Sequence, residues 1–185
     1  MRELHRKPAT IADLADVPPT MIGQILEGEL WVHPRPNLAH AQASSALGAD
    51  LQTRFGRGNP PGGWWILYEP ELHLRKDVLV PDLAGWKKER LPELPKAAAM
   101  ELAPDWVLEV LSPSTASIDR IVKSRLYARE KVQWLWFLDP DAKTLEVMRL
   151  EGNRWLQLGA WTSGELVRAE PFDAVEFDTR EWFLP

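Results

Sequence analysis

Two short apolar runs, separated by a segment with helical periodicity, constrain the fold of this chain more than any other feature. Residues 105–112 (DWVLEVLS) and 134–140 (WLWFLDP) are almost wholly apolar, as central strands buried on both faces are. Between them, residues 117–131 have apolar side chains along one side of a helix and basic side chains elsewhere. This order predicts two parallel strands joined by a right-handed helical crossover.

The first half of the chain adds a hairpin, a long helix and further strands. Thr10 is suited to cap a short helix over 10–16, and residues 21–33 predict a hairpin that turns at Glu27-Gly28. The segments that follow are a helix over 37–56, strands over 64–75 and 78–86, and an irregular surface connection over 87–104.

The last part of the chain alternates apolar and polar residues around turns at Gly152 and Gly164, so residues 141–185 predict an antiparallel meander. A length of 185 residues favours one domain over 1–185, with residues 1–20 as an N-terminal extension. We therefore expect an α/β fold with a mixed central sheet flanked by helices, followed by an antiparallel C-terminal extension.

Composition excludes several classes of protein. The chain has no cysteine, which removes thiolate zinc sites and cysteine nucleophiles. Its net charge of −5 gives no general attraction to nucleic acid, so binding to a polyanion requires a local basic patch or a metal ion. No secretory signal or long uncharged apolar stretch is present, so we expect a cytoplasmic protein without membrane contact.

Several catalytic motifs are also missing. No serine lies in a G-x-S-x-G elbow, and the glycine-rich loop GRGNPPGG has no Lys-Ser or Lys-Thr after it. The histidines lack HExxH spacing; they are His5, His33, His40 and His73. A serine hydrolase, a P-loop enzyme and a zincin metalloprotease are therefore disfavoured.

Two acids lie within apolar strand sequence, Asp82 in LVPDLAGW and Glu109 in WVLEVLS. A buried carboxylate is costly unless a protein cation or a bound metal ion pairs with it. Oxygen ligands with no cysteine beside them favour Mg²⁺ or Mn²⁺ over zinc. A structural interpretation also stays open, in which Asp82 begins a turn and Glu109 pairs with an arginine.

The order of these segments resembles a known family. VPDLAGW, PDWVLEVLSPST and DRIVKSRLYAREKVQWLWFLDP, preceded by ILEGELWVHPRP, are similar to the Uma-two type endonucleases. These form a restriction-endonuclease-like branch of the PD-(D/E)XK nuclease superfamily. The resemblance extends from about Met21 to Trp182 and implies the restriction-endonuclease-like fold.

The resemblance also implies a catalytic site. Asp82 and Glu109 would be metal ligands for Mg²⁺ or Mn²⁺, and Val110 would offer its backbone carbonyl. The lysine of the usual E-x-K element would fall at Leu111, which cannot act. Lys123, in the following helix, matches the position from which this branch supplies its lysine.

Other positions match the family more weakly. Glu29 would be a further acid near the metal ion, and His40 would contact phosphate or water. The candidates for contacts to the phosphate backbone are Arg54, Arg57, Arg120, Arg125 and Arg129. A charged helix face of this kind is usually only solvated.

The expected function is therefore metal-dependent hydrolysis of phosphodiester bonds in nucleic acid, with DNA as the expected substrate and a homodimer as the expected assembly. An alternative remains: an inactive protein of the nuclease fold that serves as a binding or oligomerisation module. The acidic net charge and the missing lysine at Leu111 favour this alternative.

Overall fold

The computed structural model describes residues 8–57 and 61–184, so residues 1–7 of the expected N-terminal extension lie outside the described part. The strands are β1 (Met21–Leu26), β2 (Glu29–Pro34), β3 (Trp64–Tyr68), β4 (Leu72–Leu74), β5 (Asp77–Leu79), β6 (Leu83–Lys87), β7 (Trp106–Val110), β8 (Trp134–Asp139), β9 (Thr144–Glu151), β10 (Arg154–Thr162), β11 (Leu166–Val167) and β12 (Phe177–Asp178). The helical segments are α1 (Ile11–Leu14), α2 (Leu38–Leu51), the π-helical η1 (Gln52–Gly56) and η2 (Ile118–Lys123), α3 (Ser124–Arg129) and the 3-10 helix η3 (Thr179–Trp182). Within the described ranges, no helix has the length and apolar character needed to cross a membrane.

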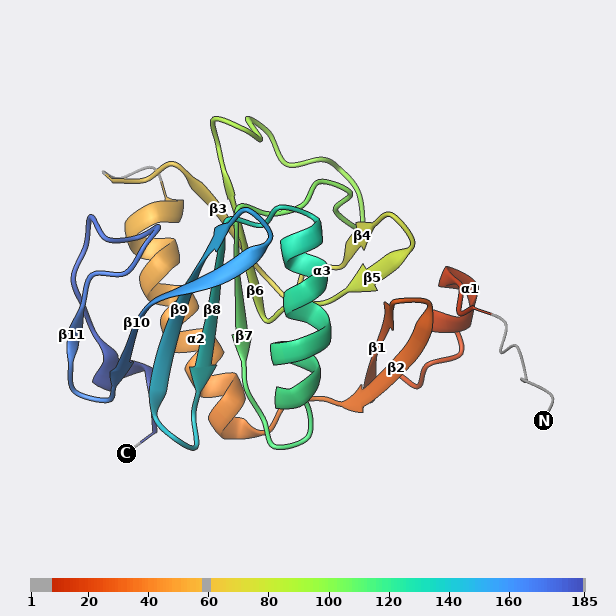
Figure 1. Ribbon diagram of the computed structural model, residues 1–185, viewed down its shortest axis with the longest axis horizontal. Helices are drawn as coiled ribbons and strands as arrows, with labels where there is room; N and C mark the ends of the chain where they lie inside the picture. The colour runs from red at the N-terminus through yellow and green to blue at the C-terminus, as the bar shows by residue number, and fades with distance from the viewer. Residues whose placement is uncertain (1–7, 58–60, 185) are drawn as a thin grey trace.

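The central sheet has six strands in the order β10-β9-β8-β7-β6-β3 (Figure 1). Its neighbours are antiparallel except β7 and β8, which pair in parallel and are joined through η2 and α3. The mixed sheet and the parallel pair expected from the two apolar runs are therefore present.

Helices cover both faces of this sheet (Figure 1). On one face, α2 packs Leu47 and Leu51 against Trp106 and Trp136. On the other face, α3 contributes Leu126 to a second apolar cluster with side chains of β7 and β8. Because β7 is buried along its whole length, any polar side chain on it lies inside the protein.

A second sheet has the order β2-β1-β5-β4 and includes the predicted hairpin. Glu27 and Gly28 form the hairpin turn, both with positive φ (54° and 86°), as a two-residue turn of this hand requires. The segment 78–86, expected as one strand, is instead divided between the two sheets as β5 and β6. Pro81 lies at the break, where a residue without an N–H cannot continue a strand ladder.

The C-terminal part extends the fold with antiparallel strands. β9 and β10 continue the central sheet, whereas β11 and β12 form a separate pair. Between β11 and β12 the chain forms turns, and Phe172 from this stretch is fully buried. Its ring lies 5.1 Å from the ring of Trp106 and 5.6 Å from that of Trp136. The extension thus completes the core beneath β7 and β8.

We predict that Phe172→Ala lowers the free energy of unfolding by roughly 3–5 kcal/mol, because it removes a buried aromatic ring and leaves a cavity. Leu166→Ala is the control, since Leu166 is 62% exposed and its truncation should change stability by less than about 0.5 kcal/mol. Urea denaturation measures both variants. Equal stabilities of the two variants would contradict the packing role of Phe172.

Candidate active site

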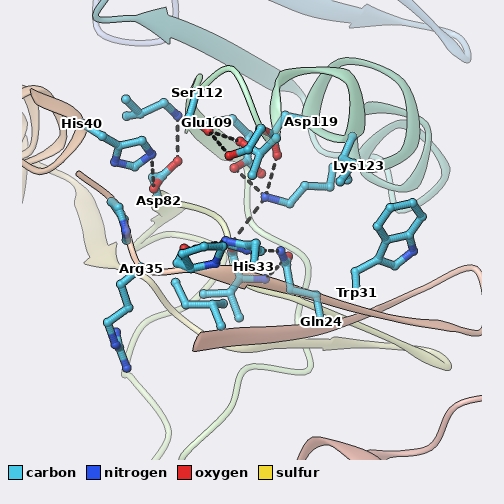
Figure 2. A pocket seen from close by; sticks show the side chains of 18 of the residues that line it. Gln24, Trp31, His33, Arg35, His40, Asp82, Glu109, Ser112, Asp119 and Lys123 are labelled. Atoms are coloured by element: carbon cyan, nitrogen blue, oxygen red, sulfur yellow. Dashed lines mark hydrogen bonds and ion pairs between the residues drawn. The ribbon is translucent and has the colours of Figure 1, made fainter. Parts of the chain in front are cut away.

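A cleft of about 270 Å³ lies where the two sheets meet, at the C-terminal end of β7 (Figure 2). Its lining comes from the β1-β2 hairpin, the first turn of α2, the break between β5 and β6, the turn 112–115 and the start of η2. Asp82, Glu109 and Lys123 all line it. Three elements that are distant in sequence therefore bring the predicted site residues together.

Asp82 is held from two sides. Asn37 caps α2 by accepting a hydrogen bond from the backbone N–H of His40 (2.9 Å), which places His40 in the first turn of the helix. The imidazole Nε2 of His40 lies 3.2 Å from Oδ1 of Asp82. The other oxygen of Asp82, Oδ2, accepts a hydrogen bond from the backbone N–H of Val110 (2.7 Å). The carboxylate is thus fixed between α2 and the end of β7.

The environment of His40 favours its charged form. Burial lowers the pKa of His40, but its hydrogen bond to Asp82, the negative charge of Asp82, the Val110 backbone and the charge of Asp119 together raise that pKa above its usual value. Within the described residues, the buried Nδ1 of His40 has no hydrogen-bond partner. His40 therefore lines the cleft with an imidazole whose charged form is favoured by Asp82 and whose buried Nδ1 is not used by the described residues.

Glu109 is almost completely buried on β7, with 1% of its surface exposed. Its Oε2 accepts a hydrogen bond from Nζ of Lys123 (2.6 Å), and its Oε1 accepts one from the hydroxyl of Tyr127 (2.5 Å). Burial, with the negative charges of Asp119 and Asp82, raises the pKa of Glu109 to about 8 although the Lys123 ammonium opposes the shift.

Lys123 is a buried cation of the cleft, with 3% of its surface exposed. Besides Glu109, its ammonium lies 3.1 Å from Oδ1 of Asp119 and 3.5 Å from the carbonyl oxygen of Val80 (Figure 2). Burial disfavours the ammonium, but Glu109, Asp119 and Asp82 outweigh burial and raise the pKa of Lys123. Lys123 therefore stays charged at neutral pH. The lysine that the family resemblance singled out thus lies at the end of β7 beside Glu109.

Sequence reasoning missed two buried partners on the same helical stretch. Asp119 is 4% exposed and lies four residues before Lys123, and Tyr127 lies four residues after it. That spacing, which brings residues to one face of a helix, was the signal that could have found both. The fully buried Tyr127 hydroxyl has a pKa raised well above its usual value by burial and by the charge and hydrogen bond of Glu109.

Sequence reasoning also missed residues of the four-stranded sheet. Gln24, which is 3% exposed, accepts a hydrogen bond at Oε1 from the Val80 N–H (2.9 Å). Its amide nitrogen lies 3.2 Å from Nε2 of His33. Arg35 lines the cleft as well. No motif marks these residues, because only the packing of β1 beside β5 brings them to the site.

Other predicted residues lie elsewhere. Glu29 is exposed at the start of β2 and does not line the cleft. Arg120 forms an ion pair with Glu146 (2.5 Å) and Arg125 one with Glu27 (3.2 Å). The cleft lining includes none of the arginines predicted for phosphate contacts, which are Arg54, Arg57, Arg120, Arg125 and Arg129.

The donor groups suit a hard divalent cation. The carboxylates of Asp82, Glu109 and Asp119 all line the cleft, and oxygen donors of this kind match Mg²⁺ or Mn²⁺. In the part of the chain that the structure describes, no three acids or histidines form a ready metal cluster. The oxygens of Glu109 are instead engaged by Lys123 and Tyr127.

The mixed sheet with helices on both faces and the cleft at the end of β7 define an α/β protein with its candidate site at the junction of two sheets. The chain belongs to the Uma2 family, described as "Putative restriction endonuclease", whose model matches residues 13–180. Restriction-endonuclease-like proteins generally use divalent metal ions.

A solved structure has the same fold. It is described as a "putative nuclease belonging to DUF820" from Anabaena variabilis and has a TM-score of 0.74 and 22% sequence identity to this chain. The match covers 95% of this chain and 97% of that one. No curated protein matches the chain.

The raised pKa of Glu109 predicts a pH dependence of stability. Between about pH 5 and pH 8, the folded protein binds a proton at Glu109 that the unfolded chain has released. The free energy of unfolding should therefore fall as pH rises through this window, by at most about 1.4 kcal/mol per unit from this group. Glu109→Gln should make the slope shallower in urea denaturation, whereas Glu93→Gln, at an exposed position, should leave it unchanged. Parallel pH profiles for wild type and Glu109→Gln would contradict the prediction.

Proposed function

We propose that the protein is a metal-dependent endonuclease that hydrolyses phosphodiester bonds of DNA. The observation that carries the proposal is the convergence of Asp82, Glu109 and Lys123 in one cleft of a chain of the Uma2 family. Two carboxylates and a lysine are the groups that the nuclease resemblance requires. Their arrival from the break before β6, from β7 and from η2 supports a site selected for chemistry, since none of the three is needed to close the apolar core.

In this proposal, Asp82, Glu109 and the Val110 carbonyl hold Mg²⁺ or Mn²⁺. A divalent ion in such a site neutralises charge on the scissile phosphate and lowers the pKa of a bound water. Of the donor groups, Asp82 is already oriented by the Val110 N–H. Each Glu109 oxygen accepts one hydrogen bond, from Lys123 or Tyr127, and its second lone pair can bind the ion, although the nearby Lys123 ammonium opposes an arriving cation.

Basic side chains of the cleft can contact the nucleic-acid substrate or the attacking water. Lys123 remains an ammonium at neutral pH and can hold the attacking water or stabilise charge on the phosphate. His40, with its raised pKa, can donate a hydrogen bond to a phosphate oxygen. Arg35 lines the cleft with its side chain 58% exposed and can meet the DNA backbone at the entrance.

We predict that wild-type protein cleaves plasmid DNA in Mg²⁺ or Mn²⁺ and that Asp82→Ala abolishes the cleavage. Lys123→Ala should lower the rate by about 10² or more, because it removes the ammonium that positions water or phosphate. Gel electrophoresis measures cleavage, with single-stranded DNA and RNA as parallel substrates. The matched controls are Asp173→Ala and Lys96→Ala, at exposed positions outside the cleft lining, which should cleave at the wild-type rate.

The outcomes separate the candidate functions. Cleavage at an unchanged rate in Asp82→Ala would identify a contaminating nuclease. Absence of cleavage in the folded wild-type protein, under all metal conditions and with every substrate, would favour the inactive binding module. The observation that favours the inactive binding module is that both Glu109 oxygens already accept hydrogen bonds, from Lys123 and Tyr127.

We also propose that one domain carries this function in the cytoplasm and that it acts as a homodimer, since a dimer presents two cleavage sites to the two strands of a duplex. Sedimentation velocity at micromolar concentration should then give about twice the chain mass of 21.1 kDa. A single species at the chain mass would refute the dimer.

A further inference from the structure

The ammonium of Lys123 is shared between two carboxylates that belong to different parts of the fold. Glu109 is on the central sheet, whereas Asp119 is on the same helical segment as Lys123, four residues earlier. The distances from Nζ are 2.6 Å to Glu109 and 3.1 Å to Asp119, with the Val80 carbonyl at 3.5 Å. A lysine ammonium has three N–H donors, so these acceptors account for all of them.

This arrangement conflicts with the role proposed for Glu109. Its two oxygens accept hydrogen bonds from Lys123 and Tyr127. Each of these oxygens keeps a second lone pair, but a positively charged ammonium 2.6 Å from Oε2 repels an arriving cation. Metal binding is therefore favoured when the Lys123 ammonium moves away from Glu109.

We propose that Asp119 is a positioning residue that retains the Lys123 ammonium when Glu109 turns to the metal ion. The inference rests on the proposed function and deepens it. Asp119 is suited to this role because the residue is 4% exposed and its distance to Lys123 depends on a single turn of η2, not on β7. Without Asp119, the released ammonium would contact only the Val80 carbonyl among the acceptors described above, and a buried cation with no carboxylate in contact is costly.

The consequence for Asp119→Asn is a stronger hold of Lys123 on Glu109. Metal affinity should fall, because the metal ion and the Lys123 ammonium then compete for the same carboxylate, that of Glu109. Asp119 is therefore coupled to the metal site through Lys123. If Asp119 bound the metal ion directly, Asp119→Asn would also lower metal affinity, but by the same factor with or without Lys123. A double-mutant cycle therefore distinguishes a direct ligand from a positioning residue.

The test measures Mn²⁺ affinity by isothermal titration calorimetry for the wild type, Asp119→Asn, Lys123→Met and the double variant. We expect Asp119→Asn to weaken binding about tenfold or more in the wild-type background and less than about threefold in the Lys123→Met background. The smaller loss of affinity expected in the Lys123→Met background comes from the removal of one negative charge near the ion. Equal losses in both backgrounds would overturn the proposal and identify a direct ligand.

Two further variants control the cycle. The buried acid Asp77 forms an ion pair with Arg129 (2.7 Å) outside the cleft. Asp77→Asn breaks this pair and should leave Mn²⁺ affinity unchanged. Lys123→Gln, which keeps a hydrogen-bond donor without the charge, replaces Lys123→Met if the latter does not fold. Similar affinity of Asp119→Asn and the wild type would also overturn the proposal.

The cycle is read beside DNA cleavage by the same wild-type preparation. Cleavage without coupling refutes the role of Asp119 and leaves the nuclease assignment intact. Coupled Mn²⁺ binding without cleavage of any nucleic acid supports the role of Asp119 and refutes the nuclease assignment. A folded wild-type protein that binds no Mn²⁺ overturns both.

Discussion

The buried ammonium of Lys123 is the interaction on which the arrangement of the cleft depends. Three carboxyl groups lie in this region, and burial together with their mutual repulsion disfavours their charged forms. Lys123 contacts two of them directly, and His40 contacts the third. Each acid thus has a basic partner, which offsets part of the cost of placing three acids close together.

The break between β5 and β6 is what brings these groups within reach of one another. At this point the chain leaves the four-stranded sheet and enters the six-stranded sheet, with Val80, Pro81 and Asp82 between the two strands. The carbonyl of Val80 faces Lys123 and its N–H is bound by Gln24. The cleft is therefore a junction between two sheets, and the four-stranded sheet forms one of its walls.

The sequence was most informative where burial and chemistry conflict. Glu109 within an apolar strand and Asp82 after a proline were recognisable because charged residues rarely occupy such positions, and the helical position of Lys123 followed from the family resemblance. For Asp119 the only signal was its four-residue spacing from Lys123, and Gln24 gave none, since polar residues at the start of a helix or in a hairpin are common. The division of 78–86 into two strands was missed because the apolar pattern on both sides of Pro81 suits one strand as well as two.

Pairing between acidic and basic side chains also affects how a protein of net charge −5 can attract a polyanion such as nucleic acid. Three of the arginines proposed from sequence are paired with acids: Arg120 with Glu146, Arg125 with Glu27, and Arg129 with Asp77. Such pairs reduce the positive field that these side chains present at long range. The basic groups that line the cleft also have acidic partners: Lys123 with Glu109 and Asp119, His40 with Asp82, and Arg35 with Glu69. In the proposed nuclease, attraction of a phosphate group would therefore depend on the divalent ion bound in the cleft.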